Sequence, residues 1–206
     1  MAISDLPARL ATMDSATIHE SGAPMVMDGA IRHLAGPPRL CGPALTVLCP
    51  PGDNLAIHHA VASARPGDVL VVHCCDPDYG VWGEVLSLAA LQRGIAGLVL
   101  DGAIRDLSAM DAVGLPAFAR GTRLRGAAKK VPGEINIAVA CGGALVRPGD
   151  IVFGDESGIV VVPPAEVDAV VERAEERVRK EAVMMDGLRA GRTTIELLNL
   201  RKPTGA

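Results

Sequence analysis

The sequence predicts an α/β layered fold in which at least some strands pair in parallel. Two continuous apolar runs, at residues 69–73 and 95–100, are typical of strands that are covered on both faces. Segments of helical character lie between and after these runs, and this strand–helix alternation favours a parallel sheet. Gly and Pro, at 23 and 15 of 206 residues, separate the segments.

Strands and helices alternate along the first half of the chain. A helix that contains His19 and Glu20 is expected near the N-terminus. The predicted elements after it are a strand at 45–49, a helix at 53–64 with Asp53 as its cap, the strand 69–73, a helix at 83–93 stopped by Gly94, the strand 95–100, a short helix at 106–113 before Gly114, and a short strand at 116–118.

The second half is predicted to be β-rich up to residue 163 and helical after it. Short apolar runs lie at 135–140, 151–153 and 158–163. A long helix is expected from Pro164 to about Ala190, with an apolar stripe at positions 167, 170, 171, 174 and 178, and a Thr caps a last short helix within 193–198. We therefore expect a body at 1–163 and a helical extension at 164–206, packed on the body or on a neighbouring subunit.

Composition excludes several classes of function. The formal charge is −4 and aromatic residues make up only 2 %, so neither a basic face nor a base-stacking platform for nucleic acid is expected. No apolar run reaches about 18 residues, which argues against a membrane span, and the N-terminus lacks the apolar block of a signal peptide, so we expect a cytoplasmic protein. The five cysteines are odd in number and lack C-x-x-C spacing, so we expect buried apolar residues.

A first candidate site lies at the start of the predicted helix 83–93. The first amides of a helix have no intrahelical acceptor and carry partial positive charge. Gly83 has no side chain to block an approach, so a carboxylate or phosphate could rest on the amides of Gly83, Glu84, Val85 and Leu86. An ordinary glycine-containing turn is the alternative.

A second candidate is Arg105-Asp106, just beyond the strand 95–100. If strands 69–73 and 95–100 are parallel neighbours, this pair and the start of the helix at Gly83 lie at the same edge of the sheet, where α/β folds bind ligands. Arg105 can pair with a carboxylate or enolate, and Asp106 offers oxygen to a divalent cation. Alternatively, Asp106 caps the helix 107–113 and Arg105 is a solvated surface charge.

The remaining polar residues carry weaker signals. The adjacent His58 and His59 would point about 100° apart on a helix and cannot easily share an ion, and neither His19 nor His73 gains a role. Lys129 and Lys130 lie in a polar loop and are expected to be solvated. The H-E-x-x-H, G-x-S-x-G, P-loop and G-x-G-x-x-G motifs are absent from the sequence.

The motifs at 83–86 and 94–106 closely resemble the RraA-like family. That family includes class II 4-hydroxy-4-methyl-2-oxoglutarate / 4-carboxy-4-hydroxy-2-oxoadipate aldolases and the regulator of ribonuclease E activity A. The resemblance extends over most of the chain, through residues 17–20, 51–54, 65–68, 142–150 and 158–163. It implies a swivelling α-β-β layered sandwich, like that of phosphohistidine domains, assembled as a trimer or hexamer with sites at subunit interfaces.

The resemblance also implies roles for particular residues. Asp106 would bind Mg²⁺, Mn²⁺ or another divalent metal directly, Arg105 would bind the pyruvyl part of a 2-oxo acid, and amides near Val85 and Leu86 would hold its carboxylate. The aldolases carry Asp, twenty residues, then Arg-Asp; this chain has Glu84 at the first position, where regulator-type members have Gly. Glu84 would reach the metal through water. Glu196 of a neighbouring subunit is the candidate for completing the water shell.

The implied activity is that of a metal-dependent pyruvate aldolase, a carbon–carbon lyase. It would cleave 4-hydroxy-2-oxo acids to pyruvate and decarboxylate oxaloacetate, because both reactions pass through the pyruvate enolate. A lysine Schiff base is not required. The alternative implied by the same resemblance is a non-enzymatic regulator that binds a ribonuclease.

Overall fold

The central part of the main sheet is parallel, as the sequence predicts. The structure is a computed structural model that describes residues 6–10 and 12–201. Its central strands β3 (Leu40–Cys49), β4 (Val69–Cys74), β6 (Gly97–Ile104) and β7 (Ala117–Thr122) run parallel to one another. Antiparallel strands extend both sides, with β11 (Ile151–Asp155), β12 (Gly158–Val162) and β1 (Met25–Val26) beyond β3, and β2 (Arg32–Ala35) beyond β7. The expected parallel pairing of 69–73 with 95–100 is confirmed.

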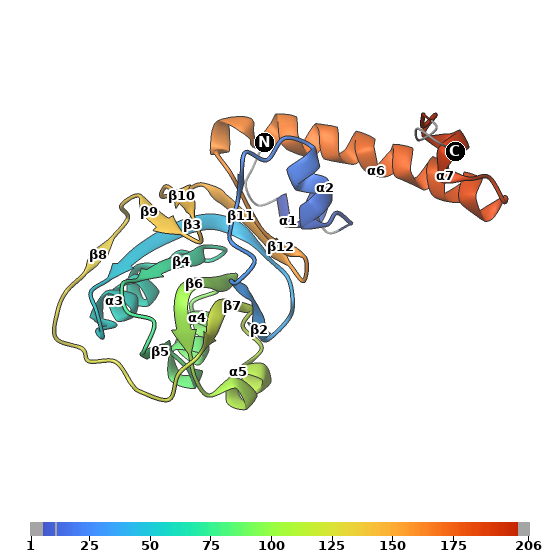
Figure 1. The fold of residues 1–206 in the computed structure, drawn as a ribbon. Helices are drawn as coiled ribbons and strands as arrows, with labels where there is room; N and C mark the ends of the chain where they lie inside the picture. Colours follow the sequence, from blue (N-terminus) through green and yellow to red (C-terminus); the bar gives the residue numbers. More distant parts are fainter. Residues whose placement is uncertain (1–5, 11, 202–206) are drawn as a thin grey trace.

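Helices cover one face of the parallel strands, and further strands cover the other (Figure 1). Helices α3 (Leu55–Ser63), α4 (Glu84–Gln92) and α5 (Leu107–Val113) contribute to a core that takes every second residue of β4 and β6, including Leu70 and Leu98. The alternate residues, such as Val71 and Val99, enter a second core with β12 and the hairpin of β9 (Val139–Cys141) and β10 (Ala144–Val146). The result is an α-β-β arrangement.

The long C-terminal helix packs on the body only through its first half. Helix α6 (Val167–Arg189) buries Val167, Val170, Val171 and Ala174 in a third core, which α1 (Leu6–Leu10), α2 (Ser15–Glu20) and the outer face of β11 and β12 complete. The predicted apolar stripe therefore faces the body. The second half of α6 extends away from it, with α7 (Thr194–Leu197) at the far end (Figure 1). Residues 1–5, 11 and 202–206 of the expected body and extension lie outside the described residues.

Several predicted strand limits are wrong, among them those of the runs at 45–49, 95–100 and 135–140. Strand β3 begins at Leu40 rather than 45, because its first residues pair with β11 and its later ones with β4, and Pro43 lies at this change of partner. Strand β6 continues to Ile104 instead of ending at 100. The expected run 135–140 is divided into β8 (Glu134–Ile135) and β9, because Asn136 adopts a left-handed conformation with φ of 57°.

The cysteines follow the expectation with two exceptions. Cys49, Cys74 and Cys141 are buried and free, whereas Cys41 is half-buried and Cys75 is exposed. Burial raises the pKa of the Cys49 and Cys141 thiols to about 12, so neither is a thiolate at neutral pH. Within the described chain, no helix combines the length and the apolar character needed to cross a bilayer.

Candidate functional site

The candidate site lies where β6 continues past the end of β4. The pairing of β4 with β6 ends at His73 and Asp101, and β5 (Gly80–Trp82) then takes the place beside β6 at Ala103 and Ile104. Strand β5 leads through Gly83 into α4, and β6 leads through Arg105 and Asp106 into α5. The two candidate motifs therefore emerge at the same edge of the sheet, as their parallel arrangement requires.

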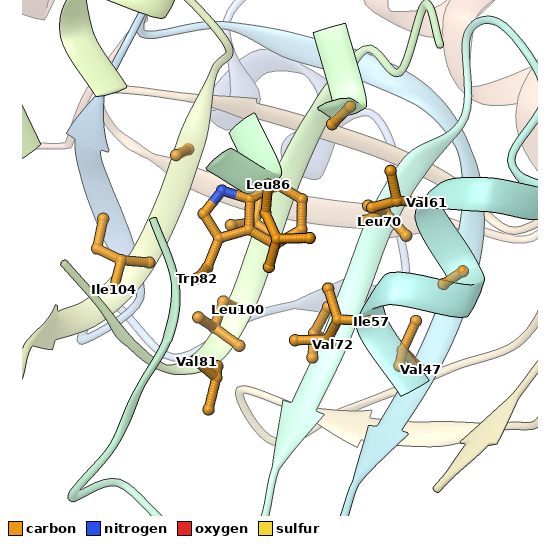
Figure 2. Packing of buried hydrophobic residues seen from close by; sticks show 14 of the residues in the cluster. Val47, Ile57, Val61, Leu70, Val72, Val81, Trp82, Leu86, Leu100 and Ile104 are labelled. Atoms are coloured by element: carbon orange, nitrogen blue, oxygen red, sulfur yellow. The ribbon is translucent and has the colours of Figure 1, made fainter. Parts of the chain in front are cut away.

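The start of α4 is held from within the core. The Trp82 indole Nε1 donates to Ser87 Oγ at 2.7 Å, and that hydroxyl lies 3.1 Å from the carbonyl oxygen of Gly83, to which it donates. Both side chains are buried, and Figure 2 shows Trp82 packed beside Leu86. Gly83 occupies the cap position in an extended conformation, so it contributes no capping side chain. These hydrogen bonds fix the position of the start of α4. Its first amides have no intrahelical acceptors.

Asp106 occupies the cap position of α5 without capping it through its side chain. Its φ is 61°, in the left-handed region, and its carboxylate makes no capping hydrogen bond. Oδ2 instead lies 3.5 Å from Arg105 Nε, and a Cβ on Gly83 would stand 2.5 Å from the same oxygen. The alternative prediction, that Asp106 caps the helix, is therefore correct for its position at the start of α5 but not for a capping hydrogen bond from its side chain. The absence of a side chain at Gly83 provides the room for this carboxylate.

Arg105 passes between two glycines. A Cβ on Gly80 would stand 3.2 Å from the Arg105 Cβ, and a Cβ on Gly126 would stand 2.8 Å from its Nη1. The Gly80 amide donates to the Arg125 carbonyl at 2.8 Å, which holds the two segments side by side. The Arg105 side chain is half-exposed, and the backbone at Gly80 and Gly126 restricts its direction. Arg105 is therefore neither a buried residue nor an unrestrained surface charge.

One cavity of about 220 Å³ collects most of the predicted site residues. Gly83, Val85, Leu86, Arg105 and Asp106 all line it. This volume lies below the roughly 300–1,000 Å³ of pockets for drug-sized ligands, so it suits a small metabolite.

Two predicted residues are not part of this cavity within one chain. Glu84 is exposed and is not among the residues that line it. Glu196 forms a capping box on α7, where its Oε2 accepts from the Thr193 amide at 3.0 Å. Hydrogen bonds from the Thr193 amide and hydroxyl lower the pKa of Glu196. Since α7 lies at the far end of α6, Glu196 is remote from the cavity of its own chain (Figure 1).

The sequence does not predict a second wall of the cavity, which Asn54, His58 and Lys129 line. Asn54 caps α3 by position, and His58 follows one turn later on the same face. The loop sequence predicts a solvated Lys129; the residue is exposed, and it also lines the cavity. The spacing of Asn54 and His58, four residues apart behind a strand end, is the signal that could have identified this wall.

The donor set suits a metal that keeps several waters. Among the described residues, no group of at least three His, Cys, Asp or Glu side chains is placed to hold an ion. Among the residues that line the cavity, Asp106 is the one that carries a carboxylate, and the missing side chain of Gly83 leaves space beside its Oδ2. One or two carboxylates, waters and substrate oxygens are the ligands that Mg²⁺ commonly takes. The residues therefore fit Mg²⁺ better than an ion that requires an all-protein cage.

Comparisons with known proteins identify relatives over most of the chain. The pattern of the RraA-like family, described as Aldolase/RraA, matches residues 4–161. A protein of Halalkalibacterium halodurans, named "Putative 4-hydroxy-4-methyl-2-oxoglutarate aldolase", is 37% identical over 163 residues, which cover 77% of this chain and 78% of that protein.

Solved structures share the fold. An uncharacterized protein from Pseudomonas syringae pv. tomato superimposes with a TM-score of 0.86 at 26% identity, covering 96% of this chain and 93% of that one. Streptomyces coelicolor RraAS2, described as an unusual member of the RNase ES inhibitor RraA protein family, gives 0.78 at 30% identity, covering 88% and 96%. With the match over residues 4–161, these likenesses establish that the chain belongs to the RraA-like family.

Proposed function

We propose that the protein is a divalent-metal-dependent pyruvate aldolase that cleaves 4-hydroxy-2-oxo acids and also decarboxylates oxaloacetate. The observation that carries this proposal is the convergence of Arg105, Asp106 and the first amides of α4 on one small cavity. A guanidinium, a metal-binding carboxylate and free peptide amides match the carboxylate and oxo groups of a 2-oxo acid. The name of the 37% identical relative supports the same reaction class.

Asp106 would hold Mg²⁺ or Mn²⁺, with Glu84 and a neighbouring subunit's acidic residue, Glu196 being the candidate, acting through water. Bound there, a divalent ion supplies positive charge beside the 2-oxo group and lowers the pKa of a coordinated water. Arg105 lies 3.5 Å from Asp106 and would place its guanidinium on the same substrate oxygens.

The residues around the cavity act on developing negative charge. Cleavage of the C3–C4 bond, with transfer of the C4 hydroxyl proton to water, leaves the C4 half as a carbonyl compound and the pyruvate half as an enolate. Loss of CO₂ from oxaloacetate leaves the same enolate, and a proton from water then converts it to pyruvate. Arg105 stabilises this charge, and the amides of Val85 and Leu86 hold the carboxylate in place. The buried Val81, Trp82 and Leu86 form an apolar wall that limits water around the enolate.

Pyruvate release tests the proposal directly. Oxaloacetate and 4-hydroxy-4-methyl-2-oxoglutarate are supplied with Mg²⁺, with and without EDTA. Turnover should stop with EDTA and return with excess Mg²⁺. Arg105→Ala should lose most activity, whereas Arg93→Ala, an exposed residue at the end of α4, should retain it. Turnover unaffected by chelation, or an active Arg105→Ala enzyme, would contradict the proposal.

A regulator that binds a ribonuclease is the second candidate, favoured by the likeness to RraAS2. Retention of a ribonuclease on the immobilised protein, together with no metal-dependent pyruvate release, would support it over the aldolase.

The proposed enzyme is a cytoplasmic homo-oligomer, a trimer or hexamer. The part of the chain beyond the body carries exposed apolar side chains at Val183, Met185, Ile195 and Leu198. In the proposed assembly a neighbouring copy covers these side chains, and Glu196 of α7 lies near the cavity of another chain. Light scattering of the purified protein measures the assembly, and a monomer would contradict this arrangement.

A further inference from the structure

Trp82 is hydrogen-bonded to both sides of the candidate site. Its side chain lies in the core, and its indole Nε1 donates to Ser87 Oγ at 2.7 Å. Its carbonyl oxygen accepts from the Arg105 amide at 2.9 Å. One buried residue of β5 is therefore bonded to α4 through its side chain and to the segment that carries Arg105 through its backbone.

The hydrogen bonds at Ser87 run in one direction. An indole N–H can only donate and a carbonyl oxygen can only accept. Ser87 Oγ therefore accepts from Trp82 and donates its own hydrogen to the Gly83 carbonyl oxygen, 3.1 Å away. The same oxygen also accepts from the Ser87 amide at 3.0 Å. Two donors of one fully buried residue thus fix the Gly83 carbonyl from within the core.

The fixed carbonyl of Gly83 sets the direction of the first amide of α4. A peptide group is planar and trans, so the C=O of Gly83 and the N–H of Glu84 lie in one plane and point in opposite directions. Because the oxygen is bound on the side of Ser87, the N–H is directed toward the N-terminal end of the helix, which borders the cavity at Gly83 and Val85. Hydrogen bonds in a chain also polarise one another, so a carbonyl that accepts twice leaves a more positive N–H on the same peptide group.

We propose that Trp82 and Ser87 are positioning residues for the substrate carboxylate. They act through the peptide group between Gly83 and Glu84, and Trp82 acts also through the backbone of Arg105. This inference rests on the proposed function, which places the carboxylate on the first amides of α4. A purely structural role, in which the same bonds only stabilise the core, predicts different kinetics and is the alternative outcome of the test.

The kinetic test measures pyruvate release from oxaloacetate by Ser87→Ala. The carboxylate is held equally before and during bond cleavage, so KM should rise about three- to tenfold, the range of one hydrogen bond, and kcat should change by less than about twofold. A purely structural role predicts the opposite split, because a smaller folded fraction lowers the apparent kcat and leaves KM unchanged.

Ser63→Ala is the matched control. Ser63 Oγ makes the same kind of bond on α3, to the His59 carbonyl at 3.0 Å, and the residue does not line the cavity. Its replacement should leave KM and kcat unchanged. A Ser63→Ala enzyme with the same rise in KM as Ser87→Ala would show that the effect is not specific to the hydrogen-bond chain at α4.

Trp82→Phe tests the other end of the chain. The phenyl ring keeps an aromatic side chain in the core, and the main-chain carbonyl that binds Arg105 is retained, so the main loss is the indole N–H. KM should rise, but by less than in Ser87→Ala. The double variant should have the KM of Ser87→Ala alone, since both changes break one chain of bonds. If Ser87→Ala does not fold, Trp82→Phe measured against Ser63→Ala decides the same question.

Trp82 is the one tryptophan of the chain, so its fluorescence reports on this position directly. Pyruvate added with Mg²⁺ to the wild-type protein should change the emission, because a carboxylate on the Glu84 amide alters the same chain of hydrogen bonds. The pyruvate concentration at half-saturation should rise in Ser87→Ala by the same factor as KM and should not move in Ser63→Ala.

An unchanged KM in both Ser87→Ala and Trp82→Phe, or a loss confined to kcat, would overturn the proposal. Failure of the aldolase proposal would show separately, as no pyruvate release by the wild-type protein. The fluorescence titration then decides the positioning role. Weaker binding of pyruvate by Ser87→Ala, with unchanged binding by Ser63→Ala, would support it. Equal affinities in all three proteins, or no change of emission in the wild type, would contradict it.

Discussion

Two Asp–Arg clusters, one within β6 and one just past its end, differ in how completely their hydrogen-bonding atoms are paired and in their exposure. At Asp101, Oδ1 accepts from Arg120, Oδ2 accepts from the Gly142 amide at 2.7 Å, and Arg120 binds Asp28 at 2.7 Å. Just past the end of the strand, Arg105 and Asp106 contact mainly each other, at 3.5 Å. The Asp101 side chain is 14% exposed and that of Asp106 is 46% exposed. The same residue types thus form one saturated cluster and one open cluster.

Hydrogen-bond saturation, more than residue type, distinguishes the charges that stabilise the fold from those proposed to bind substrate. Burial opposes the charged form of Asp101, but hydrogen bonds from Arg120 and Gly142 outweigh it and lower its pKa. The Asp101 cluster joins β6, β7 and the β9–β10 hairpin, and it leaves few lone pairs for a ligand. Arg105 and Asp106, in contrast, keep hydrogen-bonding atoms that a ligand in the cavity could bind.

The largest expected effect follows from removing the open carboxylate. Asp106→Asn should reduce metal-dependent kcat by about 10²–10³-fold, the range for loss of one charge-stabilising group. Thermal unfolding should be nearly unchanged, since the carboxylate makes no capping bond. Steady-state pyruvate release and a melting curve measure the two quantities. A variant that unfolds earlier but keeps its turnover would place Asp106 with the structural cluster.

Filling the space beside Asp106 is expected to have the next largest effect. In Gly83→Ala the new Cβ would stand 2.5 Å from Asp106 Oδ2, so the carboxylate must move. Activity should fall by about ten- to a hundredfold, because small displacements of reacting groups have effects of this size. The backbone at Gly83 is extended, so Ala itself introduces little strain.

Gly121→Ala, in β7 with nothing within 4 Å of a new Cβ, is the matched control and should be fully active. A Gly83→Ala enzyme with normal turnover would show that Asp106 tolerates displacement.

The saturated cluster should respond in stability instead of turnover. Asp101→Asn should lower the free energy of unfolding by about 1–3 kcal/mol at pH 7, the effect of leaving a buried partner unpaired. The folded pKa of Asp101 is depressed, so its contribution is present above the ordinary pKa of about 4 and is lost as the pH falls below it. Urea unfolding should therefore show a difference between wild type and variant at pH 7 that narrows below pH 4. If the difference in unfolding free energy between wild type and variant did not change with pH, the charge of the Asp101 carboxylate would not be its cause.

The smallest effect is expected at Glu84. Its side chain is exposed and outside the cavity lining, so a role through water predicts a change of a few-fold only. Glu84→Asp should keep activity and Glu84→Gln should raise the Mg²⁺ concentration needed for half-maximal rate. Identical Mg²⁺ titrations for all three proteins would contradict a role in metal binding.

The sequence predicts the layered fold and one wall of the site well, because those signals are local. Apolar runs such as 69–73 report burial on both faces, and the motif at Gly83 combines a strand end with a helix start. The left-handed conformation of Asp106 is harder to predict from the sequence. In a non-glycine residue, a φ of 61° is determined by the surrounding structure and not by the residue type.

The other wall depends on contacts that no single segment encodes. Lys129 lines the cavity in a loop that is held by Asp53, whose carboxylate accepts from the amide of Lys130, 77 residues later. The separation of Asp101 from Asp106 likewise depends on Arg120 and Gly142, which arrive from other strands. Local periodicity carries no information on long-range pairing of this kind, so the sequence alone predicts a solvated Lys129 and no role for Asp101.

The extension of β6 past β4 has a consequence for binding entropy. Arg105 and Asp106 emerge directly from a central strand, and Gly83 follows a strand paired to it, so none of them belongs to a long free loop. Ordering a loop around a ligand consumes part of the free energy of association, and a rigid frame avoids most of that loss. A small oxo acid can make only a few contacts. If the residues that make them are already fixed in position, less of their free energy is lost in ordering the site, and binding needs fewer contacts.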